Sequence, residues 1–233
     1  MGLYERKKTL SDIFTNTKKG SIQEVKLSLP NRPLTSGEVK LVQSVYKNSI
    51  DCSKIKIYLG SYFPFDAQDV DTLVTPNGNV YVMQKLYKSD YSTETDDFKK
   101  IFLHEMGHVW QHQKKLKVLI HAGAVQACAR LKSTNPNDYN IFETKKYPSK
   151  IMPNLVETLP KKFVDYNLEQ QAEMVSDYWA IQHGGIGLLS RNNKANIKNH
   201  NLTQVIELSL YTTNFTEPLS YQGSAFLKLP KFP

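Results

Sequence analysis

The stretch FLHEMGHVWQHQ, residues 102–113, constrains the fold of this chain more than any other. His104 and His108 are four residues apart, so a helix places both imidazoles on one face, about one turn from each other. Aspartates open the wider segment 96–116 and lysines close it, which suits both ends of a helix dipole. Uncharged side chains predict a buried back for this helix: Met106, Gly107, Val109 and Trp110. We therefore expect a long helix that packs into the core and presents two histidines.

The same spacing predicts a zinc site. Zinc binds imidazole nitrogens at about 2.0–2.1 Å, and two histidines one turn apart can reach a single ion. Glu105 follows the first histidine, and its carboxylate can take a proton from a water on that ion and pass it to a leaving amine. This is the HExxH arrangement of metalloproteases. We assign His104 and His108 as zinc ligands and Glu105 as the general base.

Gly107 is unexpected in the middle of a helix, where glycine costs about 1 kcal/mol relative to alanine. One explanation is that another backbone, or the substrate, approaches the helix closely at this position. The other is strain that the fold simply tolerates.

A catalytic zinc ion needs a third protein ligand and one open position. His112 follows one turn further on, but the three histidines span about 12 Å of helix axis, so they cannot all bind one ion. The metzincin pattern is also excluded, because it requires glycine at Gln111 and histidine at Lys114. We interpret His112 as a residue beside the site or on the surface, and we expect the third ligand on a later helix.

Segment 167–183 is the candidate for that helix. It carries three acids, each four residues from the next, on one face: Glu169, Glu173 and Asp177. Stacked carboxylates repel one another, and a nearby cation would relieve the repulsion. In glutamate-zincins of the thermolysin type, the ligand is followed four residues later by an acid that orients a histidine. Both Glu169 with Glu173 and Glu173 with Asp177 have this spacing, so the residues leave Glu169 and Glu173 as alternatives.

The rest of the chain predicts an α+β fold, mostly helical, with a small sheet before the HExxH helix. We divide it into a basic N-terminal arm, residues 1–33, and one domain, residues 34–233. Segment 140–163 reads as irregular because of its prolines. The remaining expected elements are a helix at 34–50, strands at 53–60 and 75–83, a helix at 121–132 and a short helix at 197–211.

Two further roles follow from this order of elements. The strand Asn77–Met83 is placed to bind an extended substrate as an exposed edge strand, although an internal hairpin strand is the alternative. Candidates to stabilise a tetrahedral intermediate are Tyr178, Tyr211 and His183.

The net charge of +8, from 30 basic and 22 acidic residues, favours anionic neighbours without choosing among them. The lysines form no stripe with interleaved aromatics, so we expect no nucleic-acid partner. The sequence contains no run of 18 apolar residues, so we expect no membrane span, and its N-terminus has no signal-peptide pattern. Cys52 and Cys128 could form a disulfide, but free buried thiols are the expectation.

Three strings, TPNGNVYV, FLHEMGHVWQHQ and NLEQQAEMVSDYW, resemble the zincin-type metallopeptidase toxin domains of type VI secretion effectors. These domains occur at the C-terminus of some VgrG spike proteins and among Vgr-related and Rhs-linked toxins. The resemblance covers residues 35–185 and implies a zincin-like fold with Glu169 as the third zinc ligand. It also implies a toxin secreted without a signal peptide, which acts in the periplasm of rival bacteria. A separate spike carrier and an immunity protein are the partners that such a role requires.

We therefore expect a zinc-dependent peptidase or amide hydrolase that acts on protein or on peptidoglycan peptide. A non-catalytic binding module with a zincin fold is one alternative, and Glu105 argues against it because a structural zinc site needs no base. A basic nuclease-type toxin is another, and the HExxH with its uncharged flanks argues against that.

Overall fold

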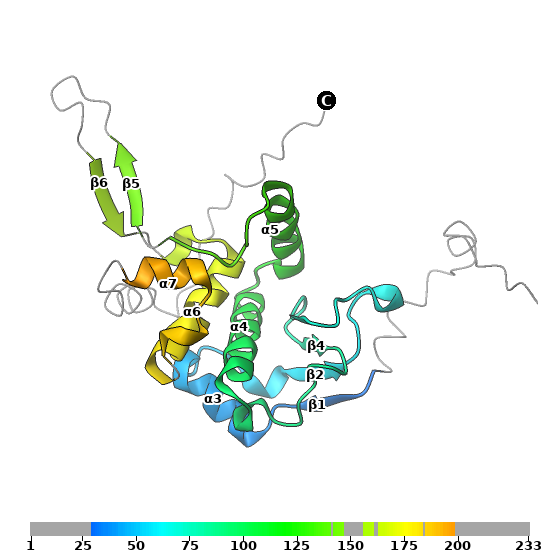
Figure 1. Ribbon diagram of the computed structural model, residues 1–233. Coiled ribbons are helices and arrows are strands. Elements are labelled where there is room, and N and C mark those ends of the chain that lie inside the picture. Colours follow the sequence, from blue (N-terminus) through cyan, green and yellow to red (C-terminus); the bar gives the residue numbers. More distant parts are fainter. Residues whose placement is uncertain (1–28, 141, 147–155, 161–162, 184, 199–233) are drawn as a thin grey trace, which may run out of the picture.

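The computed structural model describes residues 29–140, 142–146, 156–160, 163–183 and 185–198, and Figure 1 shows their arrangement. They form an α+β fold with several helices and a small sheet, as the sequence predicts. The helices are α3 (Ser36–Tyr46), α4 (Asp96–Gln113), α5 (Val118–Lys132), α6 (Leu168–His183) and α7 (Arg191–Lys198). The strands are β1 (Asn31–Pro33), β2 (Lys56–Leu59), β3 (Leu73–Val74), β4 (Val80–Val82), β5 (Phe142–Lys146) and β6 (Val156–Pro160).

The main sheet has the strand order β1-β2-β4-β3. Strand β4 is parallel to β2 and antiparallel to β3, so it lies inside the sheet and is no edge strand. The prediction of an exposed substrate-binding edge at Asn77–Met83 is therefore wrong. The reason is visible in the sequence, since Val80, Tyr81 and Val82 are consecutive apolar residues, all buried, as is typical of interior strands. The edge beside β4 is β3.

A buried ion pair links strand β1 to helix α3 at the start of the domain. Thr35 and Glu38 form a capping box at the start of α3, and the fully buried Glu38 receives two hydrogen bonds of 2.7 Å from Arg32. Arg32 belongs to β1, which pairs antiparallel with β2. The last residues of the predicted arm thus form an edge strand of the sheet, and residues 1–28 lie outside the described residues.

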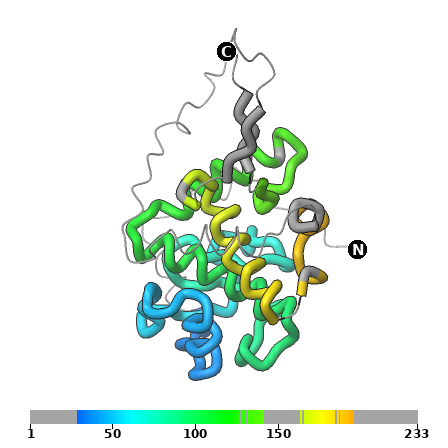
Figure 2. The backbone as a smooth tube through the Cα atoms, turned by 90° about the vertical axis from the view of Figure 1, so that its left-hand side faces the viewer, coloured from blue at the N-terminus to red at the C-terminus, as the bar shows by residue number. Residues whose placement is uncertain are grey.

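Helices α4 and α6 lie side by side in both views (Figure 1, Figure 2). Gly107 is at their contact, where an added Cβ would lie 2.8 Å from the Cβ of Ala172 and 2.9 Å from its Cα. Real Cβ atoms do not approach a backbone so closely. This glycine therefore allows the close approach of a second backbone, the first of the two explanations considered for it.

Segment 140–163, expected to be irregular, contains the antiparallel hairpin β5–β6, paired from Phe142 with Pro160 to Lys146 with Val156. Figure 1 shows it projecting from the helices. The expectation was wrong because the prolines do not interrupt the ladder. Pro160 is at a strand end, where proline is tolerated.

Three further expectations concern the end of the domain, membrane spans and the cysteines. Of the short helix expected at 197–211, residues 199–211 lie outside the described residues, and α7 ends at Lys198. Within the described part of the chain, no helix is both long and apolar enough to cross a membrane. Cys52 and Cys128 are free, but Cys128 is exposed and Cys52 only half-buried.

Candidate metal centre

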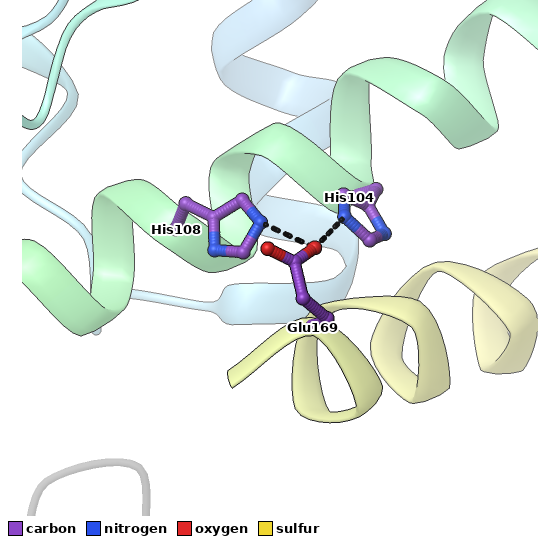
Figure 3. A group of neighbouring side chains, drawn as sticks. All are labelled: His104, His108 and Glu169. Atoms are coloured by element: carbon purple, nitrogen blue, oxygen red, sulfur yellow. Dashed lines mark ion pairs between the residues drawn. The ribbon is translucent and has the colours of Figure 1, made fainter. Parts of the chain in front are cut away.

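Three predicted ligand residues converge at the crossing of α4 and α6. Figure 3 shows His104 and His108 on α4 facing the carboxylate of Glu169 on α6. Oε2 of Glu169 lies 3.5 Å from Nε2 of His104 and 3.4 Å from Nε2 of His108. One donor atom from each residue lies within 4.8 Å of the others. Glu173, the alternative third ligand, points to the far side of His104 and not into this group.

These distances fit a divalent cation of zinc's size. Ligands 2.0–2.1 Å from a tetrahedral zinc ion are about 3.4 Å apart, and both nitrogen–oxygen distances are close to this value. Two imidazoles and one carboxylate are also the donor set of thermolysin-type catalytic zinc, which leaves one position open. The donor set and both nitrogen–oxygen distances therefore fit zinc.

The second ring nitrogen of each histidine is already engaged. Nδ1 of His104 lies 2.9 Å from Oε2 of Glu173, and Nδ1 of His108 lies 2.9 Å from Oε1 of Gln111. A carboxylate can only accept, so Nδ1 of His104 carries the proton. The Gln111 amide is oriented because its Nε2 donates to the carbonyl of Leu168 at 2.9 Å, which turns its oxygen toward His108. Both Nε2 atoms are thereby left as the free donors for a metal.

The charges within the group are strongly coupled. Burial lowers the pKa of His104, but the carboxylates of Glu169 and Glu173 outweigh it and raise that pKa to about 10. Burial opposes ionisation of Glu169, and the two imidazoles still lower its pKa well below the usual range. A metal ion therefore has to displace a proton from the histidines, so metal affinity rises with pH.

Glu105 lies beside the three residues without joining them. Its side chain is buried, and its Oε2 accepts a hydrogen bond of 2.7 Å from the hydroxyl of Thr75. Burial raises the pKa of the Glu105 carboxyl, against the opposing pull of both histidines. A raised pKa makes this carboxylate a better proton acceptor. Thr75 follows β3 directly, so the end of the edge strand fixes one oxygen of Glu105.

A cavity of about 530 Å³ opens over the group. Edge strand β3 and the first turns of α5 contribute to its lining, together with His108, Glu105 and Glu169. The lining from β3 and its continuation is Thr72, Leu73, Val74, Thr75 and Pro76, and the lining from α5 is Val118, Leu119, Ala122, Gly123 and Gln126. The strand edge that could pair with an extended chain thus borders the buried acids and histidines.

The remaining predicted candidates lie elsewhere. His112 is exposed and its ring packs against Gly78, consistent with its exclusion as a ligand. Tyr178 and His183 lie about 14 and 21 Å beyond Glu169 along α6 at 1.5 Å per residue, and His183 stacks on Trp179. Neither is among the residues that line the cavity, and their assignment to a tetrahedral intermediate stays a prediction. Tyr211 lies outside the described residues.

Sequence reasoning missed three residues that support the group: Gln111, Thr75 and Lys100. Gln111 was considered only as a departure from the metzincin pattern, although a polar residue three positions after a ligand histidine on the same helix face is a usable signal. Thr75 is 30 positions from Glu105, and no local pattern connects them. Lys100, one turn before His104, could have been noticed because it interrupts an otherwise buried face.

Comparison with known proteins places the chain in a class. A solved effector domain of a type VI secretion spike protein matches 77% of this chain and 90% of its own length, with a TM-score of 0.53 and 30% sequence identity. The chain therefore belongs to this family of type VI secretion effector domains. The solved relative is the effector domain of VgrG2b from Pseudomonas aeruginosa.

The chain aligns with the full-length VgrG2b spike protein over 164 residues at 31% identity, and this alignment covers 70% of the chain. The chain spans only 14% of the length of that spike protein. No family model matches the chain.

Proposed function

We propose that this effector domain is a zinc-dependent peptidase or amide hydrolase of the HExxH type, with a zincin-like fold. The observation that carries the proposal is the convergence of His104, His108 and Glu169 beside a cavity that His108, Glu169 and Glu105 line. A pair of histidines that served only the core would not need a third donor at tetrahedral spacing, nor a buried carboxylate directed at the same cavity.

The three donor residues would hold the ion, which supplies a Lewis acid for the scissile carbonyl and lowers the pKa of a water. Glu105 takes the proton of the attacking water and delivers it to the leaving nitrogen as the amide bond breaks. Thr75 holds one oxygen of Glu105 at 2.7 Å, so the other oxygen is free to face the water. The edge of β3 aligns an extended substrate by main-chain pairing.

The biological setting follows from the family. An effector of type VI secretion is delivered by the secretion machine, so a spike protein is the expected carrier. We infer that the target is protein or peptidoglycan peptide in the periplasm of rival bacteria, and that the producing cell holds an immunity protein.

Growth of a bacterial host tests the proposal. Expression of wild-type protein with an added periplasmic signal peptide should arrest growth, and expression without the signal should not. Glu105→Gln should abolish the arrest, because loss of a general base costs about 10²–10⁴-fold in rate.

Metal analysis completes the test. Both wild type and Glu105→Gln should bind about one zinc ion per chain, because Glu105 is no ligand. Toxicity of Glu105→Gln equal to that of wild type, or full activity in a zinc-free preparation, would contradict the proposal.

A further inference from the structure

A buried chain of charged side chains runs away from His104. Lys100 lies one turn before it on α4, and its ammonium is 2.6 Å from Oε1 of Glu173. The other oxygen of Glu173 is the one that holds Nδ1 of His104 at 2.9 Å. Lys100 is also 3.0 Å from Oδ1 of Asp177, close enough for an ion pair although off the direction of a hydrogen bond. Glu173 is thus held at both oxygens, one by a histidine and one by a lysine.

The far end of this chain is anchored in two other elements. Asp177 is fully buried, and its Oδ2 accepts hydrogen bonds from the hydroxyl of Tyr139 at 2.8 Å and from Nδ2 of Asn193 on α7 at 3.1 Å. The backbone N–H of Tyr139 donates in turn to Oδ1 of Asn193 at 3.2 Å. Asp177 is therefore held at Oδ1 by Lys100 and at Oδ2 by Tyr139 and Asn193.

A buried lysine requires a reason. Its side chain is only 12% exposed, and desolvating an ammonium is strongly unfavourable unless partners replace its water. The two carboxylates of Glu173 and Asp177 provide that replacement. In exchange, the ammonium fixes the rotamer of Glu173, which would otherwise be free to rotate away from His104.

We propose that Lys100 is a positioning residue of the metal centre, which fixes the orientation of His104 through Glu173 and is itself held by Asp177. The inference rests on the proposed function, since it concerns how tightly the three donors hold zinc. It differs from a purely structural role, in which Lys100 only links α4 to α6. A structural link affects the stability of the metal-free protein and leaves the zinc affinity of the folded protein unchanged.

The test is the zinc Kd, measured by competition with a chromophoric chelator, alongside urea unfolding of the metal-free protein. Lys100→Met should weaken zinc binding about tenfold, the lower end of the 10–100-fold cost of removing a residue that supports a ligand. Lys100→Arg keeps a cation that can bind both carboxylates, and it should restore most of the affinity. Lys99→Met is the matched control, because Lys99 pairs with the partly exposed Asp96 on the same helix.

An unchanged zinc Kd in Lys100→Met, with or without a loss of stability, would overturn the inference. If that variant does not fold, Asp177→Asn takes its place, because it removes one of the two charges that hold Lys100 and keeps the size of the side chain. It should weaken zinc binding by a smaller factor, about threefold, and an unchanged Kd there overturns the inference as well. Failure of wild type to bind zinc at all would instead overturn the proposed function itself.

Discussion

His104 and His108 are one turn apart on the same helix and face the same carboxylate, yet they are oriented in different ways. His104 donates to Glu173, a carboxylate that pairs with Lys100, and Lys100 pairs in turn with Asp177. His108 donates to Gln111, an amide. The Nε2 of Gln111 donates to the carbonyl of Leu168 and to Oε1 of Gln171. The Nε2 of Gln171 donates in turn to two backbone carbonyls.

The difference shows what a charged partner costs in a protein interior. A buried carboxylate needs compensating charge, so the support of His104 extends over three ionised side chains and reaches α7. A buried amide needs only donors and acceptors, which the backbone supplies nearby. In return, the carboxylate makes His104 more basic than an amide can, and a more basic imidazole is a stronger ligand. The two histidines are therefore expected to respond differently to substitution and to pH.

The largest effect is expected from Glu173→Gln. The amide keeps an oxygen for Nδ1 of His104, but it removes the charge and leaves Lys100 with Asp177 alone. Zinc affinity should fall about 10–100-fold, as measured by chelator competition. Glu94→Gln is the control, because Glu94 is a partly exposed carboxylate paired with Lys88. Affinity equal to wild type in both variants would show that the charge on the partner of His104 does not matter, and the contrast between the histidines would fail.

The next effect concerns the amide network. Gln111→Ala leaves buried groups on His108, Leu168 and Gln171 without their partner, so the free energy of unfolding should fall by about 1–3 kcal/mol. Zinc affinity should fall about tenfold, less than in Glu173→Gln.

Urea denaturation of the metal-free protein measures the stability effect. Gln113→Ala is the matched control on the same helix, since the hydrogen bonds of Gln113 to Asp51 are exposed. A loss in Gln111→Ala no greater than in Gln113→Ala would contradict the structural account of this network.

The smallest effect is a pH dependence confined to the charged network. Burial, against the pull of Lys100, raises the pKa of Asp177 from 3.8 to about 6. The folded state then binds a proton at this carboxyl more tightly than the unfolded state does, so the contribution of Asp177 to the free energy of unfolding decreases as pH rises from about 4 to about 6. Below that window both states are protonated, and above it both are ionised.

Asp177→Asn removes this titration, so its free energy of unfolding should lack that decrease. Denaturation of the metal-free proteins at pH 4, 5 and 6 makes the comparison. Gln111→Ala, which changes no titratable side chain, should keep the wild-type decrease. The same pH dependence in wild type and Asp177→Asn would show that the carboxyl of Asp177 does not titrate in this range.

Several parts of the fold and the candidate site follow from local patterns. The sequence predicts α3, α4 and α6 from the helical spacing of their apolar residues, and β2 and β4 from the apolar residues of each strand. These patterns depend only on residues that are close in sequence. The pairing of His104 with His108 is of the same kind, because four residues always make about one helical turn. Strand β3 was missed because two residues carry no periodicity, and the hairpin β5–β6 was missed because its strands pair with each other and need little apolar pattern.

The sequence by itself determined the two histidines, the glutamate between them and the helix that holds the third donor, because each depends only on spacing within one element. The tertiary structure alone decided which acid of α6 faces those histidines. Ala172 packs against Gly107, and this contact turns Glu169 toward both Nε2 atoms and Glu173 toward the back of His104. Three acids on one helix face are equivalent in sequence, and only the crossing with α4 makes them different.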